Sequence, residues 1–421
     1  MGQLISPDDS WLDLMDLHDG TPFWPRRDGI IATHPPLPGD VSCEVCVVGA
    51  GITGSLVALE LTRRGIDVVV VDRRDAGGGS TSASTSMLQY EIDELMIDLT
   101  AAIGWEAAAT AYRECSRGID LVERATQAVG DTCGFRRSPS VFMAVGKRDV
   151  AMLRSEMAAR ADAGFDVRWL SADELMDRWK LVGVAAIESA TGGSVDPYQL
   201  CYRALQTAIR RGARVHDRTE VTAYELTARR TMLSTNRGTI KARHVVIAAG
   251  YEVEPLLPQL PLRLHSSFAL VSEPIQGLDR RYPDGLLFWD FDDPYLYGRV
   301  TDDERLLIGG RDERYRDPRR RRRALPTKTR ALAADAARRF PGAGSIEVGY
   351  SWCGTFAETP DGLAYIGGHS SWPRTLFALG FGGNGITYSA LAAQYLAEHI
   401  ESGAVPEAAR LFDLERAKVT P

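Results

Sequence analysis

Residues 44–72 of the chain read EVCVVGAGITGSLVALELTRRGIDVVVVD. The stretch opens with a short β-branched run suited to a fully buried parallel strand, and a second run of the same kind closes it. Between them, apolar residues recur at helical spacing until Gly65, where the predicted helix ends. This order predicts a βαβ unit of about thirty residues.

Three glycines at the first strand-to-helix junction, Gly49-x-Gly51-x-x-Gly54, match a dinucleotide-binding fingerprint. The string alone is weak in a chain with 40 glycines, but the flanking strand and helix and the acidic Asp72 after the second strand supply the required context. Gly49 permits the tight turn, Gly51 lets the backbone approach a pyrophosphate, and Gly54 lets the helix lie close to the strand. Asp72 would accept hydrogen bonds from ribose hydroxyls, and its charge disfavours a 2′-phosphate.

Two later segments distinguish FAD from NAD as the bound dinucleotide. The loop GGGSTSASTS at residues 77–86 offers hydroxyl and backbone donors to the inner phosphates and ribityl chain of an extended flavin, which an NAD enzyme does not need. The strand RHVVIAAG, ending in Ala249-Gly250, predicts a second close approach of the backbone to the nucleotide. Together these features favour FAD.

With these motifs the sequence resembles the D-amino acid oxidase-like family of flavoproteins, which includes glycine and sarcosine oxidases and amine or amino acid dehydrogenases. The resemblance rests on VVGAGITG, Asp72, the loop Ser80–Ser86, Val221, WCG at 352–354, TPDG at 359–362 and LGFGGNG at 379–385. Their order and spacing match over about residues 41 to 400. The resemblance implies an α/β fold, with a doubly wound FAD-binding domain of the Rossmann-like, glutathione reductase type interleaved with an antiparallel-sheet α+β substrate domain.

The motifs favour a non-covalent FAD site and no metal ion. Ile386 is expected to begin a helix whose N-terminus faces the flavin, where its dipole would stabilise negative charge. Cys353 lies within one residue of the position where some relatives attach flavin covalently, but its register is off by one. The residues predicted to bind FAD are Gly49, Gly51, Ile52, Thr53, Gly54, Asp72, Arg73, Ser80, Thr81, Ser84, Thr85, Val221, Ala249, Gly250, Gly354, Gly380, Gly382, Gly383, Asn384, Gly385 and Ile386.

Changes of pattern along the chain divide it into alternating segments. Residues 1–38, rich in Pro, Asp and Trp, are predicted to form an extended arm over the main body. The FAD-binding domain is expected at residues 39–140, 195–252 and 347–421, and the substrate domain at residues 141–194 and 253–346. Helical segments are predicted at 88–130, 148–163, 171–179 and 197–211.

The substrate pocket lacks the charges that the resemblance would lead us to expect. Amino acid-oxidising relatives usually hold the substrate carboxylate with Arg or Lys, because close charge pairing stabilises it. Here the three matching positions read Gln89, Phe356 and Thr387. Either the substrate lacks an α-carboxylate in the usual place, or another cation holds it. Arg299 is the candidate for that cation, with a surface or interdomain ion pair as its alternative role.

Aromatic residues near Arg299 are candidates for the pocket wall, since aromatic faces attract ammonium groups. They are Phe288, Trp289, Tyr295 and Tyr297, with sheet packing as the alternative. The acids Glu91, Asp93 and Glu94 could attract a cationic amine, but a solvated helix face is the favoured interpretation. His265 is expected to be a packed or surface histidine, because hydride transfer from an amine needs no dedicated base.

Composition excludes several classes of function. The net charge of -7 argues against nucleic acid as a partner. No stretch approaches the ~20 apolar residues that span a bilayer, and the acidic N-terminus lacks a secretory signal, so a cytoplasmic location is the default. Cys43 and Cys46 have the spacing of a metal or redox pair. Residues three apart on a strand point to opposite faces, however, so buried thiols are expected there.

The sequence therefore predicts an FAD-dependent oxidase or dehydrogenase that oxidises a C–N bond of an amine or an amino or imino acid by hydride transfer to flavin N5. The electron acceptor is O2 or another oxidant. Oxidase relatives often place a lysine near N5, and the segment PYLYGRV has none, which favours the other oxidant. One alternative is an NADPH-dependent flavin monooxygenase, which would carry a Gly-Asp motif where this chain has Asp361-Gly362. The other is a non-catalytic FAD-binding subunit of a larger oxidoreductase complex.

Overall fold

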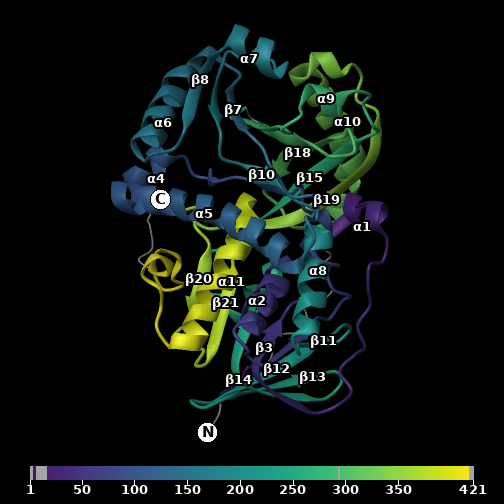
Figure 1. Cartoon of the computed structure of the whole chain (residues 1–421), viewed down its shortest axis with the longest axis vertical. Helices are drawn as coiled ribbons and strands as arrows, with labels where there is room; N and C mark the ends of the chain where they lie inside the picture. The colour runs from purple at the N-terminus through teal and green to yellow at the C-terminus, as the bar shows by residue number, and fades with distance from the viewer. Residues whose placement is uncertain (1–2, 6–16, 293, 417–421) are drawn as a thin grey trace.

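The computed structural model describes residues 3–5, 17–292 and 294–416. Within these residues the chain forms two large sheets, one above the other in Figure 1. The first sheet contains, in this order, β1 (Gln3–Ile5), β12 (Val221–Leu226), β13 (Thr231–Thr235), β14 (Thr239–Ile247), β3 (Val41–Val48), β4 (Val68–Val71) and β11 (Arg214–His216). In addition, β21 (Thr375–Leu379) pairs with β14, and β20 (Tyr365–Gly368) pairs with β21. The second is ordered β2 (His18–Gly20), β19 (Val348–Glu358), β15 (Arg263–Ser272), β18 (Leu306–Glu313), β17 (Leu296–Val300), β16 (Leu287–Asp290), β7 (Ser140–Ala144), β9 (Ala185–Ser189) and β8 (Val167–Ser171).

Helices flank both sheets, and some cross part of the region between them (Figure 1). The helices are α1 (Phe23–Asp28), α2 (Ile52–Arg63), α3 (Ser80–Ala83), α4 (Met96–Ile103), α5 (Trp105–Val129), α6 (Val150–Asp162), α7 (Ala172–Trp179), α8 (Pro197–Arg210), α9 (Leu278–Arg281), α10 (Pro318–Arg339) and α11 (Gly385–Ser402). A small third sheet joins β5 (Met87–Leu88), β10 (Gly193–Ser194) and β6 (Arg136–Arg137).

The predicted βαβ unit is formed by β3, α2 and β4. The two strands pair in parallel, with Val45 opposite Val68, and every residue of β4 is buried. One face of the sheet packs against α2, α8 and α11, and on the other face Val69 shares an apolar cluster with Tyr224 and Trp372. Burial of both faces explains why these strands read as continuous apolar runs.

The second sheet is the predicted antiparallel one, with a single parallel pair among the described strands. β7 and β16 run in parallel, with Ser140 opposite Leu287. β7 comes from the earlier segment predicted for the substrate domain, and β16 from the later one. The parallel pair therefore joins two pieces of chain that enter the sheet separately.

Two parts of the chain differ from the predicted division into domains. β19 falls within residues 347–421, predicted for the FAD-binding domain, but it pairs with β15 of the second sheet. The arm at residues 1–38 does more than cover the surface, because β1 pairs with β12 in the first sheet and β2 pairs with β19 in the second. Each arm strand has three residues, which is too short for an alternating pattern to reveal it.

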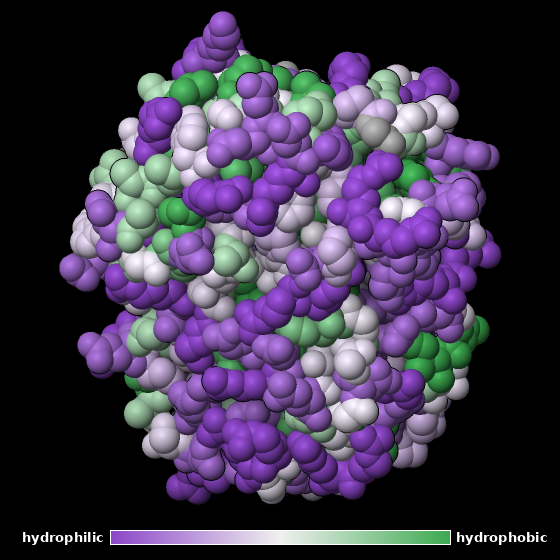
Figure 2. Space-filling model, turned by 45° about the horizontal axis from the view of Figure 1, so that its top comes forward, coloured by the Kyte–Doolittle hydropathy of each residue, from purple (hydrophilic) through white to green (hydrophobic). Residues whose placement is uncertain are grey.

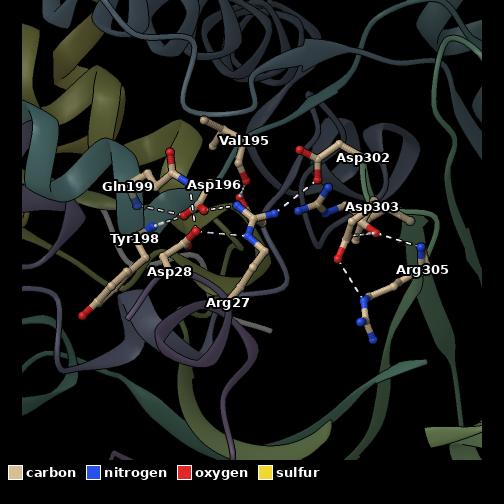
Figure 3. Close-up of polar contacts among 12 residues, drawn as sticks. Arg27, Asp28, Val195, Asp196, Tyr198, Gln199, Asp302, Asp303 and Arg305 are labelled. Atoms are coloured by element: carbon tan, nitrogen blue, oxygen red, sulfur yellow. Dashed lines mark hydrogen bonds and ion pairs between the residues drawn. The ribbon is translucent and has the colours of Figure 1, made fainter. Parts of the chain in front are cut away.

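Arg27 of α1 fastens the arm to both halves of the molecule, as Figure 3 shows. Its guanidinium pairs with Asp196, the N-cap of α8, and lies 3.2 Å from Asp302 in the loop after β17. The same group stacks over the Trp24 ring at 4.8 Å. Because Asp196 is almost fully buried, loss of Arg27 would leave a buried carboxylate without its cation, so this contact fixes the position of the arm.

The closely spaced cysteines differ in part from the prediction. Cys43 and Cys46 are buried and free, as expected. They nevertheless lie in one apolar cluster, and a hydrogen bond with Cys43, together with burial, raises the pKa of the Cys46 thiol well above its usual value. The expectation of opposite faces is therefore wrong. Cys43 lies in the first part of β3, which pairs with β14 alone, because β4 pairs with β3 only from Val45 onward.

The surface shows no extended apolar patch on the face drawn in Figure 2, where hydrophobic residues appear in small separate groups. The exposed large apolar side chains of the described residues are Ile30, Val182, Ile209 and Val405, from four distant parts of the chain. Isolated residues of this kind are ordinary. In the described part of the chain, no helix has the length and apolar character needed to cross a membrane.

The close approach of α2 to β3 gives a stability prediction. In a Gly54→Ala variant the new Cβ would lie 1.8 Å from Gly49 O, so the helix must move away from the strand. We expect a loss of about 3 kcal/mol in the free energy of unfolding, measured by chemical denaturation. In Gly368→Ala, where a Cβ would meet nothing closer than 3.7 Å, the loss should stay below about 1 kcal/mol. Equal stability of the two variants would contradict the described crossing.

Candidate active site

A cavity of about 850 Å³ lies at the carboxyl ends of the parallel strands of the first sheet. Gly49 follows β3, Asp72 follows β4 and Gly380 follows β21, and all three line it. Its other wall comes from β15, β17, β18 and β19 of the second sheet. Ligands of open α/β sheets bind at this edge, and the volume suits an organic cofactor with a substrate.

The cavity brings together nearly all residues predicted to bind FAD. The lining includes Gly49, Gly51, Ile52, Thr53, Asp72, Arg73, Ser80, Thr81, Ser84, Thr85, Val221, Ala249, Gly250, Gly354, Gly380, Gly382, Gly383, Asn384, Gly385 and Ile386. Gly54 is the exception, because it packs against Gly49 O inside the turn and shapes the turn without reaching the wall. Motifs scattered along the chain therefore meet in one place.

Asp72 organises the first glycine turn. Its carboxylate accepts hydrogen bonds from the N–H of Ala50 at 2.7 Å and of Arg74 at 2.8 Å. Burial raises the pKa of Asp72 to about 6, against these two hydrogen bonds, which lower it. The adjacent Arg73 and Arg74 both pair with Glu252, and Arg73 also lies 3.8 Å from Glu220, so both guanidinium groups are engaged by acids.

Two helices begin at the cavity wall. α2 has Gly51 as its N-cap, which carries no side chain, and α11 has Asn384, whose side chain makes no capping hydrogen bond to its own helix in the described structure. The first turns therefore direct N–H groups and the positive ends of the helix dipoles at the cavity. Thr81 Oγ1 accepts from the N–H of Ile52 at 2.9 Å. The backbone N–H groups of the next residues in the first turn of α2 suit a pyrophosphate.

Two tryptophans hold the serine loop, residues 79–86. The indole N–H of Trp24, in the arm, donates to Ser84 O at 2.7 Å, and that of Trp352, on β19, donates to Ala83 O at 2.7 Å. His18 of β2 adds a contact to the glycines before the loop. The shape of this loop is therefore set by the arm and the second sheet, which lie far from it in the sequence.

The last glycine turn is tied to the loop at residues 89–95. The Asn384 side-chain amide donates to Gln89 O at 3.0 Å and to Glu91 O at 2.8 Å. The N–H of Gly383 donates to Asp93 Oδ2 at 2.8 Å, and a Cβ at Gly383 would lie 2.6 Å from the other oxygen of that carboxylate. Glycine is required here because the carboxylate fills the space of a side chain.

Most substrate-pocket candidates line the part of the cavity that faces the second sheet, which we call the chamber. They are Gln89, Trp289, Tyr295, Tyr297 and Phe356. The rings of Tyr295 and Tyr297 stack with their centroids 5.8 Å apart, and the Tyr295 hydroxyl donates to Asp312. The chamber is therefore walled by aromatic rings beside a carboxylate.

Three candidates lie elsewhere. The Thr387 side chain packs against α5, where a Cβ at Gly118 would lie 2.5 Å from its Cγ2. Arg299 lines a separate pocket of about 170 Å³, and its Nε–H donates to Thr85 O at 2.9 Å. Burial lowers the pKa of Arg299 to about 10. Phe288 belongs to the core of the second sheet. Arg299 thus binds the serine loop from outside the main cavity.

The acids after the serine loop do not form a solvated helix face. Residues 89–95 are a loop, and α4 begins only after it. Glu91 is buried and pairs at 3.4 Å with Arg160, which also bonds Glu156 at 2.7 Å. Asp93 and Glu94 line the cavity. The helix predicted from residue 88 is wrong over this stretch, because buried ion pairs outweigh local helix propensity.

Two carboxylates of the chamber have raised pKa values. Asp93 has accessible surface inside the cavity yet lies deep in the protein, and burial raises its pKa to about 7, with added repulsion from Glu358 and Asp312. Burial likewise raises the pKa of Asp312 to about 6, against a hydrogen bond from Tyr295. Perturbed carboxyl groups inside a cavity mark it as a functional site.

Some cavity residues escaped the sequence reasoning. They are Leu17, Tyr251, Asp312 and Glu358. Glu358 could have been inferred, because it stands two residues after Phe356 on β19 and side chains two apart share a face of a strand. Leu17 had no such signal, since it precedes a very short strand of the arm.

Known proteins resemble this chain over most of its length. A family model described as FAD dependent oxidoreductase matches residues 44–399. Gamma-glutamylputrescine oxidoreductase of Escherichia coli (strain K12) is 24% identical over 377 residues, which cover 86% of this chain and 85% of that protein. Glycine oxidase of Geobacillus kaustophilus (strain HTA426) is 26% identical over 365 residues, 85% of this chain and 93% of that protein. The structure of L-proline dehydrogenase from P. horikoshii shares the fold, with a TM-score of 0.76 at 21% identity over 90% of this chain and 98% of that one.

Asp72 gives a prediction about pH. An ionised carboxylate is the better acceptor for ribose hydroxyls, so FAD affinity should rise with pH through about 6 and then level off. An Asp72→Asn variant should bind FAD about tenfold more weakly above neutral pH and should lose the pH step. Fluorescence titration of apoprotein with FAD measures both. Asp75→Asn, which alters an exposed acid 3.6 Å from Arg218, should retain both. A pH step that survives in Asp72→Asn would contradict the assignment.

The tryptophan contacts to the serine loop give a second prediction. Trp24→Phe keeps an aromatic ring but removes the donor to Ser84 O. We expect FAD affinity to fall about fivefold, the effect of one lost hydrogen bond of about 1 kcal/mol. Trp372→Phe alters an equally buried indole in the cluster on the other face of the first sheet and should leave FAD affinity unchanged. Equal losses in the two variants would argue against the contact.

Proposed function

The chain belongs to the family of FAD-dependent oxidoreductases, and we propose from this premise that it oxidises a carbon–nitrogen bond of an amine or amino acid. Glycine oxidase and gamma-glutamylputrescine oxidoreductase are named for compounds that contain such a bond. Their identity to this chain is modest, so the type of bond is carried over and the particular substrates are not.

The observation that carries the proposal is the continuity of the cavity. The same space is lined by the first glycine turn, the serine loop, the last glycine turn and the aromatic wall of Tyr295, Tyr297 and Phe356. A cofactor held by the turns and an amine held by the wall would therefore share one continuous cavity. Hydride transfer requires this, because donor and acceptor must be brought together and kept away from water.

The residues present fit a non-covalently bound FAD. Gly51 lines the cavity without a side chain, which leaves its backbone open to close approach, and serine and threonine hydroxyls line the adjacent wall. Cys353 does not line the cavity, and its thiol points to Asp19 O. Burial raises the pKa of Cys353 to about 11, which makes it a poor nucleophile for attachment to a flavin.

When bound, FAD supplies a flavin ring that takes up a hydride from the carbon beside the amine nitrogen. The aromatic faces of Tyr295 and Tyr297 bind and orient the amine. The N-terminus of α11 offers N–H groups that stabilise negative charge in the cavity. As the hydride leaves, the nitrogen lone pair forms a C=N bond and the nitrogen loses its proton. Water then adds to that bond to give a carbonyl compound and an amine, and two electrons pass on to the acceptor.

Anaerobic mixing of the yellow holoenzyme with primary amines, secondary amines and amino acids tests the proposal. We expect at least one of these compounds to bleach the flavin absorption without NADPH, while free FAD treated in the same way keeps its colour. Bleaching only with NADPH would replace the proposal by a flavin monooxygenase. No bleaching under either condition would replace it by a non-catalytic FAD-binding subunit.

Admitting air to the bleached enzyme then tests the acceptor. Because the segment PYLYGRV contains no lysine, we expect colour to return slowly with O2 and rapidly with an artificial quinone. Rapid return in air would instead identify an oxidase.

A further inference from the structure

Several carboxylates line the chamber, and four of them that act on one point form what we call the acidic set. Asp93 and Glu94 come from the loop at residues 89–95, Asp312 comes from β18, and Glu358 comes from β19. The negative charges of the other three all raise the pKa of Asp93, which places the set within electrostatic reach of one point. Like charges gathered in this way favour a positively charged ligand.

No lysine or arginine of the described residues lines the chamber to balance these charges. The cations in the cavity wall are Arg73 and Arg74, which lie beside Asp72 at the glycine turn and are ion-paired there. Lys328, behind the wall, is bonded to Glu313, which does not line the cavity. The chamber therefore keeps an excess of negative charge.

Members of the acidic set have limited partners of their own. Glu358 lies 3.0 Å from His265 Nε2, outside the cavity wall, and Asp93 accepts the backbone N–H of Gly383. Asp312 Oδ2 accepts from Tyr295, and the nearby Ser267 hydroxyl also lowers the pKa of this carboxylate, while Asp312 Oδ1 is buried and makes no hydrogen bond of good geometry among the described residues. A buried carboxylate oxygen without a donor is costly, so this oxygen is suited to a donor brought by a ligand.

The aromatic wall adds to the attraction of a cation. Tyr295 and Tyr297 stack beside Asp312, and Trp289 and Phe356 line the same chamber. An ammonium group is stabilised by aromatic faces and by carboxylates together, whereas a substrate carboxylate would be repelled by the acidic set.

We propose that the substrate is a di- or polyamine, in which one nitrogen is oxidised while a second, positively charged nitrogen is held by Asp312 and its neighbours of the acidic set. This inference rests on the proposed oxidation of a carbon–nitrogen bond and names its substrate class. The second ammonium would donate to Asp312 Oδ1 and offset the repulsion among the carboxylates. It also agrees with Gln89 and Phe356 in the chamber wall, which are uncharged and offer no cation to a substrate carboxylate.

Three compounds with the same four-carbon chain test the charge requirement. They are 1,4-diaminobutane, butylamine and 4-aminobutanoate, which share one amine and differ in a positive, neutral or negative far end. We measure anaerobic flavin reduction of the holoenzyme against concentration and repeat the series with shorter and longer chains. For the best chain length, kcat/KM for the diamine should exceed that for the monoamine by about tenfold or more, with the amino acid poorest.

Charge-removing variants then test the assigned residue. In Asp312→Asn the ratio of diamine to monoamine kcat/KM should fall about tenfold. Glu313→Gln is the matched control, because it removes the next carboxylate of the same strand, which pairs with Lys328 outside the cavity. This control should keep the wild-type ratio. Flavin content is measured in both variants, so that a fall in the ratio cannot come from lost cofactor.

The outcomes distinguish failure of the diamine inference from failure of the proposed carbon–nitrogen oxidation. Flavin reduction by monoamines or amino acids that equals or exceeds reduction by diamines of every length overturns the diamine inference and leaves carbon–nitrogen oxidation standing. Failure of all amines and amino acids to reduce the flavin overturns the proposed function itself. An unchanged diamine preference in Asp312→Asn overturns the role given to that residue.

Discussion

Three backbone segments cross at the first glycine turn with no room for a side chain. A Cβ at Gly49 would lie 2.4 Å from Ala248 O, and a Cβ at Gly54 would lie 1.8 Å from Gly49 O. This contact holds the end of β3 against the end of β14, and the contact of Gly54 with Gly49 holds α2 close to β3. The N-terminus of α2 is thereby placed where parallel strands end, and the cavity forms around that point.

The negative charge of the chamber is held by a rigid frame. Arg160, fully buried between Glu156 and Glu91, fixes the loop that carries Asp93, and Asn384 binds the same loop from the last glycine turn. Buried ion pairs of this kind add little net stability after the cost of desolvation, but they specify position. The carboxylates are therefore set in place before any ligand arrives, which lowers the reorganisation that binding requires.

Local patterns predicted the glycine turns that line the cavity, because each turn is encoded by adjacent residues. The substrate side depended on contacts between distant segments. Thr387 has its side chain against Gly118 of α5, and Arg299 turns to the serine loop, yet nothing near either residue in the sequence indicates those partners. Glu91 read as an exposed helical acid, because its partner Arg160 lies in another helix. An ion pair between segments leaves no periodic signal for a single sequence to show.

The attachment of the arm has a consequence for how the molecule is made. β2 forms its strand pair with β19. The serine loop accepts hydrogen bonds from Trp24, near the start of the chain, and from Trp352, near its end. A ribosome must therefore release nearly the whole polypeptide before these long-range pairings can close. Such late closure is slow, because distant segments must meet before any contact repays the lost entropy. The first half of the chain emerges with an unfinished nucleotide pocket, so cofactor loading belongs to the final stage of biogenesis.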